Sequence, residues 1–152
     1  MLATTRSPSR VSAIEHVGAI AIIDDGDIAA QVRARYSEGV DAALELVGTP
    51  TLPDTLRATK VHGTVCFAGM LSNEWLVKDF YPIAYIPTGV RLTAYSGASA
   101  NLPAEVLQRY VDRIASGHLR LGPSSTYTLD QIRKAHDDME KNRALGKQVV
   151  VL

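Results

Sequence analysis

The sequence is poor in cysteine, in long apolar runs and in charge of one sign. Cys66 is the only cysteine, so one chain can form neither a disulfide framework nor a structural zinc site. The longest apolar runs, Ala19–Ile23 and Val149–Leu152, are too short to span a bilayer, and residues 1–15 show no signal peptide. Sixteen basic and 16 acidic residues balance, so no overall field attracts nucleic acid or an anionic membrane. We therefore expect a cytoplasmic protein that binds neither.

Several enzyme motifs are also absent. No three glycines satisfy G-x-G-x-x-G, and Gly146-Lys147 lacks the rest of a phosphate-binding P-loop. The G-x-S-x-G motif that would indicate a hydrolase is missing. The four histidines are scattered, without the spacing of metal ligands: His16, His62, His118 and His136. A catalytic zinc ion is therefore not expected.

Short β-like runs alternate with amphipathic helical stretches, which predicts βαβ units and a parallel sheet. Strands are expected at Leu2–Thr5, Ala19–Asp24, Ala42–Val47, Gly63–Ala68, Val90–Tyr95 and Lys147–Leu152. Helices are expected at Pro8–Val17, Asp27–Tyr36, Leu52–Thr59, Pro103–Ser116 and from the Thr128–Gln131 capping box to about Asn142. The continuous apolar run Ala42–Val47 is typical of a parallel strand covered on both faces. Leu119–Tyr127, with Gly122 and Pro123, should be irregular, and a boundary near 118 separates residues 1–117 from an appendage at 118–152.

Thr5-Arg6-Ser7-Pro8 joins a predicted strand end to a predicted helix start. Free backbone N–H groups at a helix start favour an anion, and Ser7 could cap the helix. At the end of the second strand of a doubly wound sheet, Arg6 with the neighbouring hydroxyls would suit a ribose 2′-phosphate, and Arg10 could join them. The alternative is a capped, solvated helix start without a ligand.

Two glycine-containing segments follow predicted parallel strands: Glu45-Leu46-Val47-Gly48 and Phe67-Ala68-Gly69-Met70. Ligands bind at the carboxyl ends of such strands, and glycine allows close backbone approach. Ordinary glycine turns are the alternative. Glu45 is unusual inside an apolar strand, where it is either partly hydrated at the strand end or paired, and a catalytic acid is the less favoured interpretation.

The order of these segments resembles the medium-chain dehydrogenase/reductase superfamily. The similarity rests on Gly39–Gly48, Gly63–Gly69 and Gly89–Thr93, and on the closing segment Tyr127–Lys147. The branch that it resembles most is the zinc-independent quinone oxidoreductases. The resemblance implies an α/β fold with a Rossmann-like doubly wound parallel sheet and a short C-terminal helix–strand appendage. Because the chain starts at what resembles the second strand, the first strand, its glycine-rich loop and the N-terminal catalytic domain are expected to be missing.

The resemblance also implies an activity and a set of cofactor contacts. The parent enzyme would transfer a hydride from NADPH to a quinone, an activated alkene or a carbonyl, without zinc. The 2′-phosphate would contact Thr5, Arg6, Ser7 and Arg10. The nicotinamide or ribose side would contact Val47, Gly48, Ala68, Gly69, Met70 and Tyr95. Late contacts near the pyrophosphate and nicotinamide would come from Asn142 and Lys147.

The expected missing segments affect both binding and assembly. Without the phosphate loop, this chain should bind NADP(H) weakly and be inactive alone. It should also form a homodimer or require its missing N-terminal half, because loss of a central strand exposes two strand edges. A non-catalytic binding or interaction module that needs a partner chain is the alternative function.

Overall fold

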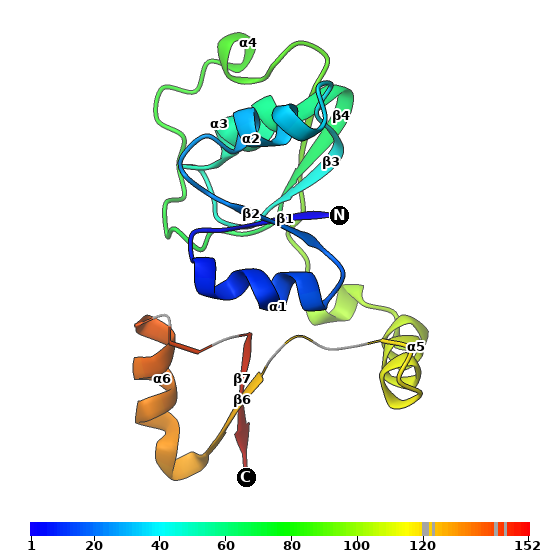
Figure 1. Ribbon diagram of the computed structural model, residues 1–152, viewed down its shortest axis with the longest axis vertical. Coiled ribbons are helices and arrows are strands. Elements are labelled where there is room, and N and C mark those ends of the chain that lie inside the picture. Colours follow the sequence, from blue (N-terminus) through cyan, green and yellow to red (C-terminus); the bar gives the residue numbers. More distant parts are fainter. Residues whose placement is uncertain (120–121, 123, 142, 145) are drawn as a thin grey trace. The chain divides into compact units, whose positions relative to one another are not determined.

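The computed structural model describes residues 1–119, 122, 124–141, 143–144 and 146–152, and the predicted cofactor contact Asn142 lies outside them. The described residues form two compact units. The central unit is Asp24–Asn101, and the terminal unit combines Met1–Ile23 with Leu102–Leu152. Helices connect parallel strands in both units, as Figure 1 shows, which confirms the predicted α/β, Rossmann-like class.

The central unit contains a three-stranded parallel sheet in the order β3-β4-β5. Its elements in chain order are α2 (Ile28–Arg35), β3 (Val40–Glu45), α3 (Leu52–Ala58), β4 (Thr59–Phe67), the short α4 (Pro82–Tyr85), β5 (Arg91–Ala94) and a 3-10 turn, η2 (Ser99–Asn101). Helices α2 and α3 lie side by side (Figure 1). Because all three strands run in one direction, their carboxyl ends share one edge of the sheet.

The core of the central unit lies between α3 and the sheet. Leu56 and Val65 are fully buried and meet Leu52 and Val90. Polar contacts then attach α2 beside α3. The Ala29 backbone N–H donates a hydrogen bond to Asp54 Oδ2 at 3.2 Å. The Arg33 guanidinium donates to three carbonyl oxygens near the ends of α2 and α3: those of Ser37, Arg57 and Thr59.

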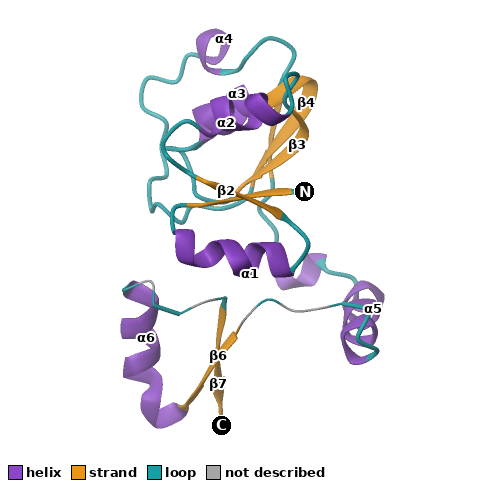
Figure 2. Cartoon of the chain, viewed as in Figure 1, coloured by secondary structure: helices purple, strands orange, loops and turns teal. Residues whose placement is uncertain are grey.

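The terminal unit contains two separate pairs of parallel strands. In the first pair, β1 (Leu2–Thr5) lies beside β2 (Ile20–Ile23), and η1 (Pro8–Arg10) and α1 (Val11–His16) connect them. In the second, β6 (Ser124–Thr128) lies beside β7 (Lys147–Val151). The connection between β6 and β7 contains η3 (Leu129–Gln131) and α6 (Ile132–Glu140), and Figure 2 shows this strand–helix–strand arrangement. Helix α5 (Ala104–Ala115) precedes β6.

Strand β3 differs from the prediction for Ala42–Val47. It begins earlier, at Val40, and ends at Glu45, so Leu46 and Val47 follow the strand. It is an edge strand in the described sheet, and Leu44 exposes 62% of its surface. The prediction that this strand is covered on both faces is therefore wrong for the described chain, since hydrophobicity alone cannot show which faces have a partner.

Two further predictions need correction. The predicted helix Pro8–Val17 begins as a 3-10 turn. Ser7 occupies the predicted N-cap position, but its hydroxyl bonds to the Ser9 hydroxyl at 2.8 Å and makes no side-chain cap. The predicted irregular segment Leu119–Tyr127 ends in the first residues of β6, which pair with β7. The capping box at Thr128 and Gln131 is confirmed.

Among the residues that the structure describes, no helix is long and apolar enough to cross a membrane. The boundary predicted near residue 118 remains a prediction. The two compact units divide the chain at other positions, and they do not test where a cofactor domain would end.

Candidate functional site

Two loops leave the carboxyl edge of the central sheet together. They are residues 45–48, which follow β3, and residues 68–72, which follow β4. Backbone hydrogen bonds join them beyond the last strand residues: Leu71 N–H donates to the Leu46 carbonyl at 3.3 Å, and Ser72 N–H to the Val47 carbonyl at 2.8 Å. The structure thus brings five predicted cofactor contacts into one place: Val47, Gly48, Ala68, Gly69 and Met70.

Glu45 ends β3 at the base of these loops and exposes only 3% of its surface. Its Oε1 accepts hydrogen bonds from the backbone N–H groups of Val47, at 2.8 Å, and Gly48, at 3.0 Å. The hydroxyl of Thr51 donates to the same oxygen at 2.9 Å, and that of Thr55 donates to Oε2. Of the alternatives that the sequence left open, the structure supports a buried, paired carboxylate. These four donors occupy both carboxyl oxygens inside the protein, so the structure does not place Glu45 as a general acid.

The glycines of the two loops serve contacts within the protein. A Cβ on Gly69 would lie 2.6 Å from the Leu46 carbonyl oxygen and 2.9 Å from the Leu46 Cα. A Cβ on Gly48, whose φ is +128°, would lie 2.6 Å from the Ser72 hydroxyl oxygen. Both glycines therefore allow the loops to approach one another, which is a different reason from the close ligand approach that the sequence suggested.

Apolar side chains remain exposed at this edge. Leu46 exposes 47% of its surface and Val47 38%, while Tyr95, which directly follows β5, exposes 59%. The Tyr95 N–H donates to the Phe67 carbonyl at 2.9 Å, which fixes the main chain of Tyr95 at the end of β4. A flat, weakly polar ring could pack against these side chains, since their apolar surface has no cover in the described chain.

Tyr85, in α4, packs against the core of the central unit and against Phe80, with ring centroids 5.0 Å apart. Burial raises the pKa of its phenol, and the negative charge of Glu45 raises it further. Its hydroxyl is buried and has no hydrogen-bond partner among the described residues. The phenol therefore stays protonated at neutral pH and senses the charge of Glu45.

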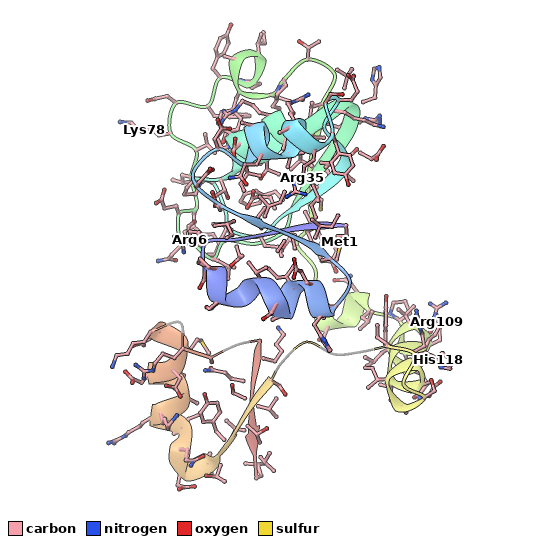
Figure 3. The ribbon with its side chains drawn as sticks, in the orientation of Figure 1. Met1, Arg6, Arg35, Lys78, Arg109 and His118 are labelled. Carbon is pink, nitrogen blue, oxygen red and sulfur yellow. The ribbon has the colours of Figure 1, made fainter. Side chains whose placement is uncertain are left out.

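The predicted phosphate contacts Thr5, Arg6, Ser7 and Arg10 lie in the terminal unit. The Thr5 hydroxyl accepts from the Ser7 N–H at 3.2 Å, which closes a tight turn around Arg6. Figure 3 shows Arg6 on this turn, and its side chain is exposed. Because a 3-10 turn and a six-residue helix follow, the charge and hydroxyls of this segment offer more to an anion than the helix dipole does. Lys147 lies exposed at the first position of β7.

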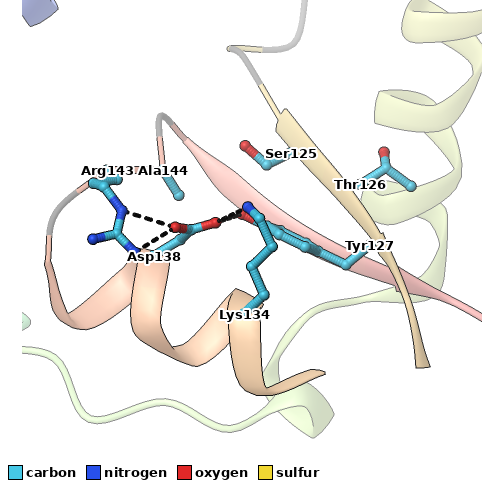
Figure 4. Close-up of a pocket in the computed structure, with 7 residues that line it drawn as sticks. All are labelled: Ser125, Thr126, Tyr127, Lys134, Asp138, Arg143 and Ala144. Atoms are coloured by element: carbon cyan, nitrogen blue, oxygen red, sulfur yellow. Dashed lines mark hydrogen bonds and ion pairs between the residues drawn. The ribbon is translucent and has the colours of Figure 1, made fainter. Parts of the chain in front are cut away.

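A second polar cluster lies between β6 and α6 and lines an open pocket (Figure 4). Its centre is Asp138, which is 7% exposed. The Asp138 carboxylate accepts from the Tyr127 hydroxyl at 3.1 Å, from Lys134 Nζ at 2.6 Å and from Arg143 Nε at 2.9 Å. Hydrogen bonds from Lys134 and Arg143 lower the pKa of Asp138 to about 2, so it is ionised throughout the neutral range. This cluster attaches α6 to β6 and has no free acid or base.

Acid should weaken the terminal unit through Asp138. Its pKa in the folded chain, about 2, lies below the usual 3.8, so its contribution to stability is complete above the usual value and is lost as the pH falls toward 2. We expect Asp138→Asn to lower stability at pH 7 and to flatten the pH dependence of unfolding between roughly pH 5 and 2. Circular dichroism during denaturant unfolding measures both effects. Glu140→Gln, an exposed change on the same helix, should leave the pH dependence intact, and an equal flattening in that variant would contradict the assignment.

No group of three or more His, Cys, Asp or Glu side chains that could hold a metal ion occurs within the described part of the chain. The described residues therefore do not fit a zinc ion.

The sequence profile of the zinc-binding dehydrogenase family matches residues 17–150. The chain belongs to this family. The predicted resemblance to the medium-chain dehydrogenase/reductase superfamily is thereby confirmed. The family description includes a metal for which the described residues offer no ligand set.

Solved structures of dehydrogenases share the fold. A quinone oxidoreductase from Pseudomonas syringae is 21% identical with a TM-score of 0.82, and the match covers 99% of this chain and 48% of that one. The Escherichia coli quinone oxidoreductase, solved in complex with NADPH, is 17% identical with a TM-score of 0.82, and the match covers 99% and 49%. An alcohol dehydrogenase from the archaeon Aeropyrum pernix is 21% identical with a TM-score of 0.79, and the match covers 99% and 42%. The chain thus spans about half the length of these proteins or less. No curated protein sequence matches it.

Sequence reasoning missed the cluster around Asp138. The spacing of Lys134 and Asp138, one helical turn apart, was its only local signal. Tyr127 lies in β6, on the other side of the turn that precedes α6, and Arg143 reaches Asp138 through the turn after α6, where its backbone N–H donates to the Asp138 carbonyl at 2.8 Å. The role of Glu45 as the acceptor for two loops was likewise visible only as an acidic residue in an apolar run.

Proposed function

We propose that this chain is the cofactor-binding part of an NADPH-dependent oxidoreductase of the quinone reductase or alcohol dehydrogenase-like type. The observation that carries the proposal is the convergence of Val47, Gly48, Ala68, Gly69, Met70 and Tyr95 at one sheet edge. Ligands of α/β proteins bind at this edge, beyond the carboxyl ends of parallel strands. The match to a dehydrogenase family supports the same assignment.

In this proposal three groups of residues, predicted from the sequence, contact different parts of the cofactor. Arg6 and Arg10, with the hydroxyls of Thr5 and Ser7, bind the 2′-phosphate, and Lys147 and Asn142 contribute near the pyrophosphate and nicotinamide. Val47 and Tyr95 pack against the nicotinamide side and exclude water from it. When bound, NADPH supplies a hydride for a quinone, an activated alkene or a carbonyl. Zinc has no part in this chemistry, and we place the protein in the cytoplasm.

Four backbone N–H groups of the two loops, those of Val47, Gly48, Ala68 and Gly69, are bonded within the protein and are not donors to the cofactor here. Glu45 already accepts from all four: its side chain from Val47 and Gly48, and its carbonyl oxygen from Ala68, at 2.9 Å, and Gly69, at 3.2 Å. The nicotinamide side is therefore recognised through side-chain packing. Together with the absence of a glycine-rich motif from the sequence, this predicts weak binding by the chain alone.

Titration calorimetry with NADPH tests the proposal. Binding in the range of tens of micromolar or weaker, about two orders of magnitude or more below a complete site, is the expected result, because hydrogen bonds to a charged phosphate each contribute roughly 1.5–3 kcal/mol. No detectable binding at millimolar NADPH would overturn it.

Arg6→Ala should abolish the preference for NADPH over NADH. The Arg6 guanidinium can bond the 2′-phosphate that only NADPH carries, and loss of one such contact weakens binding by about tenfold or more. Calorimetry with both cofactors measures the ratio of the two dissociation constants. Arg109→Ala removes an exposed arginine of α5 and should leave the ratio unchanged (Figure 3). Equal binding of both cofactors by the unmutated chain would contradict the assignment.

A homodimer is the expected assembly of the isolated chain. Strand β3 pairs with β4 on one side only in the described sheet, and with its exposed Leu44 it leaves an apolar edge that can recruit a second strand. Sedimentation velocity at micromolar concentration should give a dimer, and a folded monomer would contradict the prediction. Leu44→Lys, which places a charge on this edge, should shift the equilibrium toward monomer.

A non-catalytic interaction module remains the second candidate function. Helix α5 favours it, because no residue of that helix is buried and its apolar side chains Leu107, Tyr110 and Val111 are each about half exposed. Calorimetry separates the two functions, since an interaction module needs no affinity for NADPH.

A further inference from the structure

A single acidic residue organises both loops of the candidate nicotinamide site. Glu45 uses its side chain for the loop after β3 and its carbonyl oxygen for the loop after β4. It accepts four hydrogen bonds, from the backbone N–H groups of Val47, Gly48, Ala68 and Gly69. These are four of the six residues that the proposed function assigns to the nicotinamide side, so the conformation of that surface depends on one position.

The side chain of Glu45 accepts hydrogen bonds that the pairing of two strands does not require. The backbone bonds of Ala68 and Gly69 to the Glu45 carbonyl continue the main-chain pairing of β3 with β4, and any residue type could accept them. The bonds to Val47 and Gly48 need a side-chain acceptor that folds back over the turn. The hydroxyls of Thr51 and Thr55, at the start and in the middle of α3, then fix that acceptor from the opposite side.

The carboxylate is buried among the atoms that it positions. Glu45 is 3% exposed, and Gly48 is buried as well. A buried charge of this kind is retained only where several donors satisfy it, and four donors do so here. An amide at this position has one oxygen in place of two, so it can accept from the loop or from Thr55 but offers an N–H group to the other.

We propose that Glu45 is a positioning residue for the nicotinamide half of the cofactor. Its carboxylate fixes the main chain of Val47 and Gly48, and this fixes the Val47 side chain against which the ring packs. The inference rests on the proposed function, since it names the group that shapes the cofactor surface. Glu45 itself touches neither hydride donor nor substrate.

The first test compares two ligands on the full chain. Glu45→Ala, which removes both acceptor oxygens, should weaken NADPH binding by about tenfold. The affinity for adenosine 2′,5′-bisphosphate should stay within about twofold of the unmutated value. This ligand lacks the nicotinamide half, and the substitution leaves the contacts to its 2′-phosphate unchanged. Glu38→Ala, an exposed change in the same unit, is the matched control and should alter neither affinity. Equal weakening of both ligands would show a general loss of structure and would overturn the inference, as would no change in either.

The second test needs no ligand. Amide hydrogen exchange of the free chain should show faster exchange at Val47 and Gly48 in Glu45→Ala, while Val65 in the middle of β4 keeps its protection. Uniformly faster exchange, or unchanged rates at Val47 and Gly48, would overturn the positioning role. If the unmutated chain binds no NADPH, the proposed function fails and the cofactor part of this inference fails with it. The exchange rates still decide whether Glu45 holds the loop.

Discussion

Leu56→Ala should lower the free energy of unfolding of the central unit by about 2–5 kcal/mol, the range for a buried leucine truncated to alanine. Leu56 lies in the middle of α3, exposes 0% of its surface and packs against Val65 and Val90. The cost combines lost burial with the cavity left behind, because α3 is held at both ends and cannot collapse freely into the gap. Thr51 and Thr55 bond to Glu45 near the start of α3, and α3 leads directly into β4 at its end.

Urea unfolding followed by circular dichroism, at one fixed protein concentration, measures this loss. Leu71→Ala is the matched control, since Leu71 belongs to the same unit but exposes 82% of its surface. The control should change stability by less than about 0.5 kcal/mol. A loss below about 1 kcal/mol in Leu56→Ala would mean that α3 does not pack on the sheet as described.

Gly39→Ala is expected to have the second large effect, about 2–5 kcal/mol, from two separate causes. The φ of Gly39 is +89°, a backbone conformation that costs an alanine about 1–2 kcal/mol. The added Cβ would also lie 2.5 Å from the Ala58 carbonyl oxygen and 3.0 Å from the Lys60 backbone nitrogen. Both neighbours are main-chain atoms at the junction of α3 and β4, so they cannot move aside as a flexible side chain would.

Gly26→Ala separates the two causes. Gly26 has a φ of +101°, lies in the same unit, and would place its new Cβ with nothing within 4 Å. It should therefore show the backbone cost alone. The difference between the two variants measures the close approach of the residues around Gly39 to the α3–β4 junction. Equal losses in both variants would show that this approach is relaxed in solution.

The sequence predicted elements well where local chemistry determines them. Gly18 follows the C-cap of α1, Pro53 lies in the first turn of α3, and the Thr128–Gln131 capping box precedes α6. Each signal acts within a few residues, so a single stretch of sequence contains all of it.

Long-range contacts could not be predicted in the same way. The strand Ser124–Thr128 is polar and forms only because Val149 and its neighbours pair with it. Glu45 accepts hydrogen bonds from Ala68 and Gly69, more than 20 residues away in sequence, because β3 pairs with β4. The reason for glycine at position 69 is the main chain of Leu46, which lies more than 20 residues away in sequence. The structure therefore brings together the predicted nicotinamide-side contacts, which all lie in the central unit. That Arg6 binds another part of the same cofactor belongs to the proposed function.

The hydrogen bonds that link residues 45–48 to residues 68–72 have a kinetic consequence. These loops are ordered by the fold itself, so a ligand that arrives at this edge has little chain entropy to remove. Association there should proceed at the rate set by diffusion and orientation, without a slow closing step before or after contact. Differences in affinity among ligands for this surface should then arise almost wholly in how fast they leave.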